Sequence, residues 1–235
     1  MRILGIDTST SCGGLGLIDD DEVVAEYAFH REETPSAQLL PAIQALLQEA
    51  RLTINEIDGM AVSLGPGSFT GLRVGLSAVK GLALAAEKPV VGVPTLDALA
   101  SHLPFTPSLI CPMVDARKGE VYTALYKQGG GGGGVERLTP YQVLSPSRLL
   151  EALASQEAIF LGDGVEVYGE LIEEHLGAKA LFAPPHLRFL RGTTVAEFGL
   201  KRIMQGERDD ISSLVPIYVR ASDAEINWAK GKGIE

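Results

Sequence analysis

Apolar and polar positions alternate along the first half of the chain in a way that predicts a small sheet with helices. Three short apolar runs, separated by polar or acidic turns, have the pattern of an antiparallel meander. Thr34 and Pro35 have the residue types of a helix N-cap and first helical position, and an apolar stripe follows them. The expected order is strands at 3–7, 14–18 and 23–29, a helix at 36–51, a strand at 59–64, a helix at about 70–87, a strand at 90–93 and a helix near 95–103.

The second half of the chain repeats this plan. Its expected elements are strands at 109–115, 120–126 and 135–139, a helix at 146–154, a strand at 158–161, and helices at 165–176 and 194–205. The segments 3–7 and 111–115 are both apolar strands that end in Asp and precede a polar turn. We therefore expect an α/β fold of two βββαβα lobes, residues 1–105 and 106–206, with the segment 207–235 returning to the first lobe.

Composition and charge narrow the class of protein. Among 235 residues, 46% are hydrophobic and 21% charged, which is typical of a folded chain. The net charge of -10 repels phosphate backbones, so tight binding of nucleic acid by this chain alone is disfavoured. Because the sequence shows neither a signal-peptide pattern nor a long apolar span, we expect a cytoplasmic protein. Cys12 and Cys111 are far apart and are expected to be small buried hydrophobes.

Two glycine- and hydroxyl-rich turns are weak candidates for binding phosphate or a nucleotide. The first follows the opening strand, and the second joins a strand to a helix, where backbone N–H groups attract anions. An ordinary polar turn explains the first segment better than a phosphate site does. The second turn lacks the lysine of a Walker A loop, so its nucleotide signal is weak by itself. The candidate residues are Asp7, Thr8, Ser9, Gly65, Gly67, Ser68 and Thr70.

The helix expected at 70–87 is apolar on two sides, which indicates a second neighbour besides its own sheet. One stripe is Leu72, Leu76, Val79 and Ala83, and the other is Gly71, Gly75, Ala78, Leu82 and Ala85. The neighbour is either another part of this chain or a partner protein. As the partner interface we predict the second stripe, with its orientation left open, together with the row Leu39, Ile43, Leu46 and Ala50 of the preceding helix.

The chain offers few residues for catalysis. His30, His102, His175 and His186 are scattered, without the HExxH spacing of a metal site, and no GxSxG nucleophile motif occurs. We predict neither catalytic residues nor a bound metal. A polar group of residue types suited to acid–base work follows the strand at 109–115, although such a group more often stabilises a turn; it consists of Asp115, Arg117, Glu120 and Tyr122.

Four motifs together resemble one family: ILGIDTST at 3–10, GPGSFTGLRVG at 65–75, VDARKGEVY at 114–122 and PIYVR at 216–220. They are similar to the TsaB (YeaZ) family of bacterial threonylcarbamoyladenosine synthesis proteins. The resemblance implies an actin-like (ASKHA) fold of two ribonuclease-H-like lobes. Members that resemble this chain carry a His near 35–38, where Pro35-Ser36-Ala37-Gln38 stands here, so a role of that His does not transfer.

The resemblance also implies a function. Such proteins bind and activate TsaD, the catalytic paralogue that transfers a threonylcarbamoyl group to the adenosine next to the anticodon of ANN-decoding tRNAs. The ATPase TsaE joins the assembly, and tRNA is reached only through the complex. We expect no tightly bound cofactor, with ATP or ADP as a candidate ligand at the partner interface, and a homodimer when the partner is absent.

Two enzyme classes compete with this binding role. An ATP-dependent small-molecule kinase would need a strong nucleotide site and a carboxylate base, for which Asp115 is the candidate. A glycoprotease-like metallopeptidase would need a nucleophile or metal-bound water, and the sequence offers neither pattern. The six glycines at 129–134 are expected to form a hairpin tip, and we assign them no function.

Overall fold

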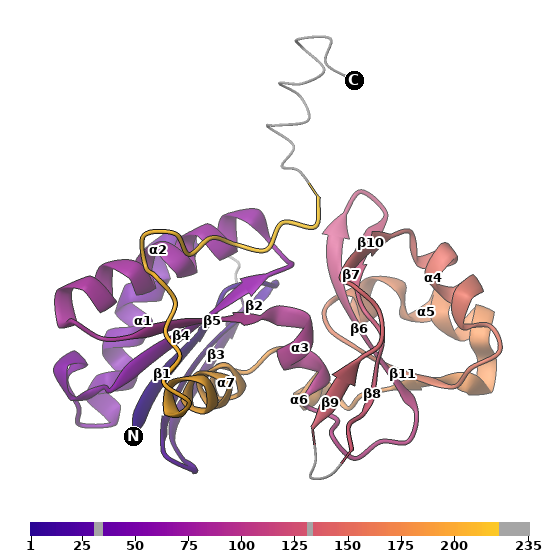
Figure 1. Ribbon diagram of the computed structural model, residues 1–235. Helices are drawn as coiled ribbons and strands as arrows, with labels where there is room; N and C mark the ends of the chain where they lie inside the picture. The colour runs from indigo at the N-terminus through magenta and orange to yellow at the C-terminus, as the bar shows by residue number, and fades with distance from the viewer. Residues whose placement is uncertain (31–34, 131–133, 221–235) are drawn as a thin grey trace, which may run out of the picture.

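The computed structural model describes residues 1–30, 35–130 and 134–220, which form two lobes side by side (Figure 1). The first lobe is built on a five-stranded sheet of order β3-β2-β1-β4-β5, in which the first three strands are an antiparallel meander and β4 and β5 run parallel to β1. Its strands are β1 (Arg2–Asp7), β2 (Cys12–Asp19), β3 (Glu22–His30), β4 (Gly59–Gly65) and β5 (Val90–Pro94). The expected N-cap Thr34 lies outside the described residues.

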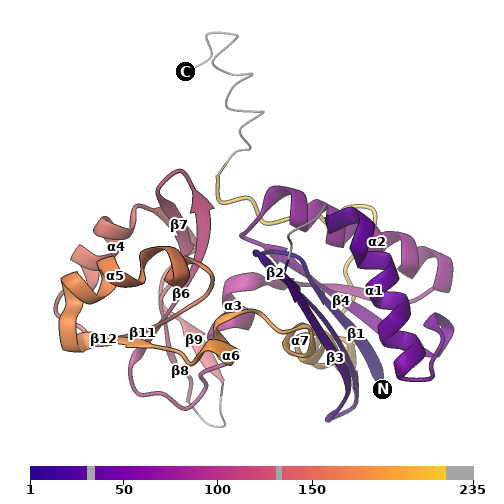
Figure 2. The ribbon, with the colours of Figure 1, turned by 180° about the vertical axis from the view of Figure 1, so that it is seen from behind.

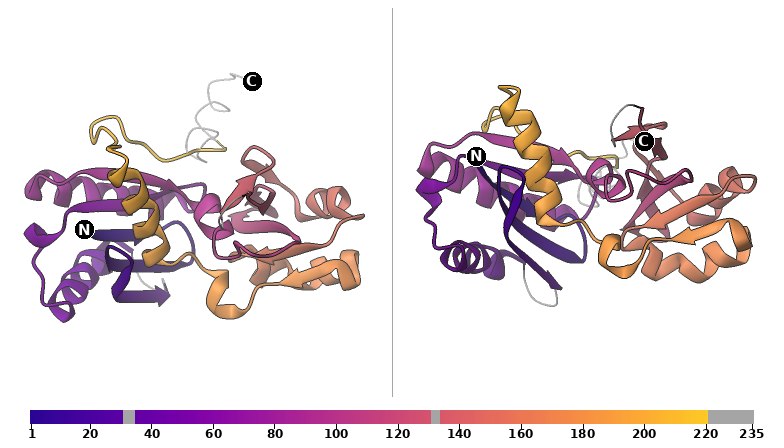
Figure 3. Two further views of the ribbon diagram at one scale, coloured as in Figure 1. Left: turned by 60° about the horizontal axis from the view of Figure 1, so that its bottom comes forward. Right: turned by 90° about the horizontal axis from the view of Figure 1, so that it is seen from below.

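Helices cover both faces of this sheet (Figures 1 and 3). The helices α1 (Pro35–Glu49) and α2 (Phe69–Ala86) lie on one face and α7 (Gly192–Met204) lies on the other. Residues of β1, β2 and β4 are buried for this reason, with side chains alternating between the two apolar layers. Glycine is required where α7 approaches: a Cβ at Gly5 would lie 2.1 Å from Gly192 O, and one at Gly16 would lie 2.1 Å from Thr193 N.

The second lobe holds a sheet of order β10-β7-β6-β11-β12, to which the hairpin of β8 and β9 is added through β6. Its helices α4 and α5 pack on the outer face of the sheet, over an apolar cluster centred on Phe160 and Ile172. The elements are β6 (Leu109–Arg117), β7 (Glu120–Thr123), β8 (Tyr126–Gln128), β9 (Val135–Arg137), β10 (Gln142–Leu144), α4 (Pro146–Leu153), β11 (Ala158–Leu161), α5 (Gly164–Leu176), β12 (Ala180–Phe182) and α6 (Pro185–Arg188).

The short helix α3 (Thr95–Ala100) lies between the two sheets and joins the lobes into one core. Its buried Leu96 and Leu99 belong to the same apolar cluster as residues of β6 and α7. Asp97 of α3 accepts hydrogen bonds from the hydroxyls of Tyr126 at 2.7 Å and Tyr141 at 2.8 Å, both in the second lobe. The connection between the lobes is therefore packed and hydrogen-bonded.

The two-lobed α/β fold predicted from the sequence is confirmed, but the chain returns to the first lobe earlier than predicted. The predicted second lobe extends to residue 206, whereas the whole of α7 lies against the first sheet. The reason is its buried face of Val195, Ala196 and Gly199, which covers the second side of that sheet. Residues 209–217 stay with this lobe, since Asp209 N donates to Val90 O at 2.9 Å and Ile217 N donates to Leu64 O at 2.8 Å. The rest of the predicted returning segment, from residue 221, lies outside the described residues.

Smaller differences concern the second lobe. The strand expected at 120–126 is divided into β7 and β8, and the short edge strands β10 and β12 were not predicted because three residues carry too little pattern. β8 and β9 form a hairpin, and the described ends of the glycine run are joined by a hydrogen bond from Gly129 N to Gly134 O at 2.8 Å; residues 131–133 lie outside the described residues. Both cysteines are buried as expected, and burial raises the pKa of the Cys111 thiol to about 12.

Candidate functional site

The hydroxyl turn after β1 is buried, and its polar groups bind protein atoms. Thr8 Oγ1 donates to Gly71 O at 2.8 Å, and Ser9 Oγ donates to Asp7 Oδ1 at 2.6 Å. Thr8, Ser9 and Thr10 each expose at most 2% of their surface. These hydroxyls therefore stabilise the turn and fix the first turn of α2 above it.

The glycine-rich loop before α2 packs directly on that hydroxyl turn. Ser68 N donates to Ser9 O at 2.7 Å, and a Cβ at Gly67 would lie 2.2 Å from the same oxygen. A Cβ at Gly75, one turn further along α2, would lie 2.2 Å from Thr8 Oγ1. The two predicted phosphate segments are thus brought together against each other. Of the seven candidate residues, Thr70 is exposed and Ser68 is half-buried, while the other five are buried.

Asp163, at the start of α5, ties this turn to the second lobe. Its carboxylate accepts from Ser11 N at 3.2 Å and from Asp115 N at 2.9 Å, one donor from each lobe. Burial raises the pKa of Asp163, and the two backbone donors oppose that rise. We did not assign it a role from sequence, although its position between Gly162 and Gly164 marks a tight turn.

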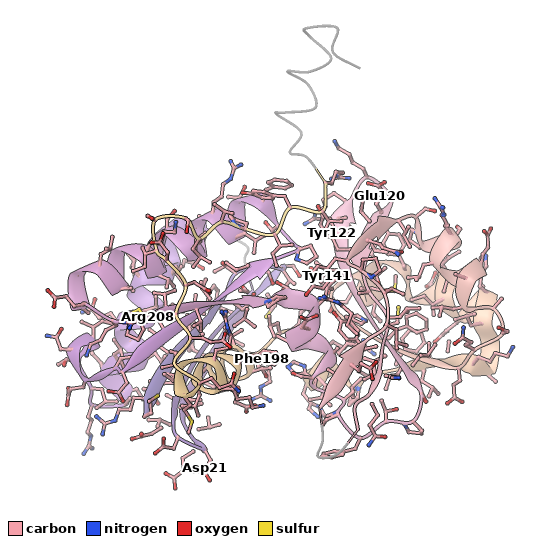
Figure 4. The ribbon with its side chains drawn as sticks, viewed as in Figure 1. Asp21, Glu120, Tyr122, Tyr141, Phe198 and Arg208 are labelled. Atoms are coloured by element: carbon pink, nitrogen blue, oxygen red, sulfur yellow. The ribbon has the colours of Figure 1, made fainter. Side chains whose placement is uncertain are left out.

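The polar group after β6 stabilises its own turn. Asp115 accepts from Arg117 N at 2.9 Å, and its second oxygen lies 3.2 Å from the guanidinium of Arg117. Glu120 lies on β7, close in space to the last described residues (Figure 4). It pairs with Arg220, which also donates to Ala116 O at 3.1 Å. This geometry fits the structural interpretation of the group better than acid–base chemistry.

The histidines whose side chains are described lie apart and hold no metal-like arrangement. His102 is largely buried between Leu187 O and Thr194 Oγ1, each 3.0 Å from a ring nitrogen, and burial lowers its pKa. His175 lies on α5 and His186 on α6, both exposed. Within the described ranges, His, Cys, Asp and Glu side chains form no group of three or more placed to hold a metal ion.

The helices α1 and α2 lie side by side (Figure 2). The structure nevertheless corrects the residues assigned to the partner interface. Leu39, Ile43 and Leu46 are at most 3% exposed because they face the sheet, and Gly71 and Gly75 are buried over the hydroxyl turn. Leu39, Leu46, Gly71 and Gly75 therefore offer almost no surface to a partner in this fold, while Ile43 lines a groove at the surface of the helix pair. Ala50, Ala78 and Leu82 are half-buried and Ala85 is exposed, so their interface role stays a prediction.

The outer surface of the α1–α2 pair is apolar at other positions. Leu40 on α1 is 50% exposed and Leu84 on α2 is 65% exposed. Beside Leu40, a groove of about 300 Å³ is lined mainly by apolar side chains, including Leu47, Ile54 and Leu82. Leu84 lies outside this groove and lines a separate pocket with Lys80 and Arg208. Length and apolar composition alone would let α2 cross a membrane, but its stripe from Leu72 to Ala83 is buried on the sheet. We call the outer surface of the two helices, which carries Leu40, Leu84 and this groove, the α1–α2 face.

Two βββαβα-type lobes, joined through α3 and meeting at the ends of β1 and β6, define an actin-like protein. The family model of TsaD, tRNA N6-adenosine threonylcarbamoyltransferase, matches residues 30–228. The protein is 32% identical to the tRNA threonylcarbamoyladenosine biosynthesis protein TsaB of Bacillus subtilis, over 99% of this chain and 100% of that one. With TsaB of Escherichia coli the identity is 35%, over the full length of both chains.

A solved structure from Pseudomonas aeruginosa, described as similar to the peptidase YeaZ, agrees with a TM-score of 0.77. Its sequence is 26% identical, and the match covers 93% of this chain and 99% of that one. The chain therefore belongs to the TsaB (YeaZ) family, within the wider group that the TsaD model describes, and TsaB proteins take part in threonylcarbamoyladenosine biosynthesis. The resemblance inferred from four motifs is confirmed.

Proposed function

We propose that this chain is a non-catalytic subunit that binds and activates TsaD in the formation of threonylcarbamoyladenosine next to the anticodon of ANN-decoding tRNAs. The observation that carries the proposal is the α1–α2 face, where large apolar side chains are exposed on two adjacent helices. Exposed apolar patches of this kind commonly mark protein–protein interfaces. The TsaD family model matches most of this chain, so we expect the proposed partner to share its fold and to present a related helix pair.

Two related helix pairs can meet around an approximate two-fold axis as a four-helix bundle. A specific contact of this kind buries roughly 800 Å² on each partner, with most of the binding energy in a few central side chains. Leu40, beside the groove, and Leu84, on the outer side of α2, are the candidates for those side chains, since each leaves at least half of its surface to solvent. The same face would support a homodimer when TsaD is absent.

The absence of a catalytic role is supported by how the polar turns are used. The hydroxyls near β1 are bonded to protein atoms, and Asp115 and Glu120 are engaged by Arg117 and Arg220. We propose that ATP or ADP binds at the interface with TsaD. We also propose that the ATPase TsaE joins the same assembly. The net charge of -10 repels phosphate, so tRNA is proposed to bind through the complex and not to this chain alone. The complex is proposed to act in the cytoplasm.

The test is binding to purified TsaD by calorimetry, together with tRNA modification by the reconstituted complex. Leu40→Glu and Leu84→Glu each place a carboxylate on the α1–α2 face. Each should raise the Kd for TsaD by about thirtyfold or more, equivalent to a loss of about 2 kcal/mol in the free energy of binding. The double variant should abolish stimulation of the modification reaction.

The matched control is Val167→Glu, because Val167 is 57% exposed on α5 in the other lobe. This control should bind TsaD as the unchanged protein does. A double variant at Leu40 and Leu84 that keeps its circular dichroism spectrum and still binds and stimulates TsaD normally would contradict the proposal.

A further inference from the structure

A second apolar groove lies on the opposite face of the first sheet, between the β2–β3 hairpin and the C-terminal half of α7. Its volume of about 520 Å³ is in the range of sites that bind ligands. Buried Ile18 and half-buried Leu200 form part of its surface, while Val23 from the hairpin and Met204 from α7 line it with exposed side chains. We call this surface the hairpin–α7 groove.

The exposed apolar side chains of this groove stand on two different elements. Val23 is 60% exposed and Met204 is 69% exposed. Single exposed apolar residues are ordinary on soluble proteins, but two that line one concave site indicate a surface for an apolar group. Methionine adds adaptability, because its unbranched side chain can adjust to different partners.

The charge around the groove is predominantly negative. Asp20 and Asp21 lie at the hairpin turn, and Glu197 lies on α7, while Lys201 is the cation among the lining residues. Figure 4 shows Asp21 at the end of the hairpin and Phe198 on α7. The terminal ammonium of Met1 bonds Asp20 at 2.7 Å, but within the described residues Asp21 and Glu197 form no ion pair. Positive charge on an occupant would therefore be attracted to this rim.

We propose that the hairpin–α7 groove is a docking site for a partner protein, bound through a basic amphipathic segment whose apolar side chains enter the groove and whose Lys or Arg residues face Asp21 and Glu197. Charge decides between occupants. A nucleic acid or an anionic membrane would be repelled by these carboxylates. The same groove of a second copy would be repelled too, because its rim carries the same carboxylates. A basic protein segment satisfies both the apolar surface and the acidic rim.

The site is independent of the proposed TsaD surface. α1 and α2 cover one face of the first sheet and α7 covers the other (Figure 3), so both surfaces can be occupied in one assembly. Failure of TsaD binding and failure of docking in this groove are therefore separate outcomes.

The first test is fluorescence anisotropy of the full chain with a labelled 12-residue amphipathic peptide of leucine and lysine, in buffer of moderate salt that screens long-range attraction. Replacing the exposed apolar walls in Val23→Ser, Met204→Ser should weaken binding about tenfold. Replacing the rim in Asp21→Lys, Glu197→Lys should weaken it by a similar factor. A peptide with serine in place of leucine should bind at least tenfold more weakly to the unchanged protein.

The matched control is Glu166→Lys, Glu170→Lys on α5, which changes the net charge by the same amount at exposed positions of the second lobe. If this control weakens binding as much as the rim variant, the peptide responds to net charge alone and the proposal is wrong. Equal binding of the serine peptide would overturn it as well.

Methyl NMR of methionine gives a readout at the groove itself. The chain has four methionines, of which Met60 and Met113 are fully buried and Met204 is the most exposed. The Met204 signal, assigned with Met204→Leu, should shift on adding the leucine–lysine peptide, while those of Met60 and Met113 stay in place. A peptide that binds without moving the Met204 signal contacts another surface, and the groove assignment then fails.

Discussion

Two glycines of α2 provide one substitution with opposite expected outcomes. A Cβ at Gly75 would lie 2.2 Å from Thr8 Oγ1, whereas a Cβ at Gly81 has no neighbouring atom within 4 Å. Both positions are inside the helix, where alanine is favoured over glycine by about 1 kcal/mol. Gly81→Ala should therefore raise the free energy of unfolding by about 1 kcal/mol.

Gly75→Ala gains the same helix propensity but must displace the Thr8 hydroxyl. Overpacking of a filled interior costs about 1–3 kcal/mol. Loss of the 2.8 Å hydrogen bond from Thr8 Oγ1 to Gly71 O adds about 1 kcal/mol. The net destabilisation is about 1–3 kcal/mol, so the two variants should differ by about 2–4 kcal/mol.

The assay is urea unfolding of both variants followed by circular dichroism, with the transition midpoints compared at a shared slope. A midpoint that rises for Gly81→Ala and falls for Gly75→Ala supports internal packing of Gly75 on the hydroxyl turn. Equal stabilisation by the two substitutions would refute this reasoning, because Gly75 would then be open to a partner helix as the sequence alone suggested.

Three further outcomes follow from the inter-lobe contacts and the polar turns. Asp163→Ala should lower the free energy of unfolding by about 2 kcal/mol or more, because Ser11 N and Asp115 N lose their acceptor, and Asp163→Asn should lose less, both measured by urea unfolding. Burial lowers the pKa of His102, so the unfolded chain takes up a proton at a higher pH than the folded chain does. The free energy of unfolding should therefore decrease as the pH is lowered from about 6.5, and it should decrease less in His102→Gln. Thermal unfolding between pH 7 and 5 measures both. Calorimetry of the isolated chain should show weak or no binding of ATP or ADP, and metal analysis should find no stoichiometric zinc or iron; low-micromolar nucleotide affinity would favour the kinase alternative.

Much of the fold could be predicted because neighbouring residues carry its signal. The run Asp19–Glu22 interrupts two apolar segments, and this places the β2–β3 turn without further information. The match of segments 3–7 and 111–115 likewise revealed the doubled lobe, because each strand needs the same apolar face and the same turn. The family followed from motifs whose spacing is set by these elements.

Periodicity determined that α2 has two apolar sides, and only the tertiary structure decided what covers each. Leu39 and Gly75 have the pattern expected for a partner interface, yet the sheet covers one and the hydroxyl turn covers the other. The return of α7 to β1 and β2 and the bond of Asp163 to Ser11 join residues more than a hundred positions apart in the chain. Burial is a property of long-range packing, so the sequence identified which faces are apolar, while the fold decided which of them remain exposed to a partner.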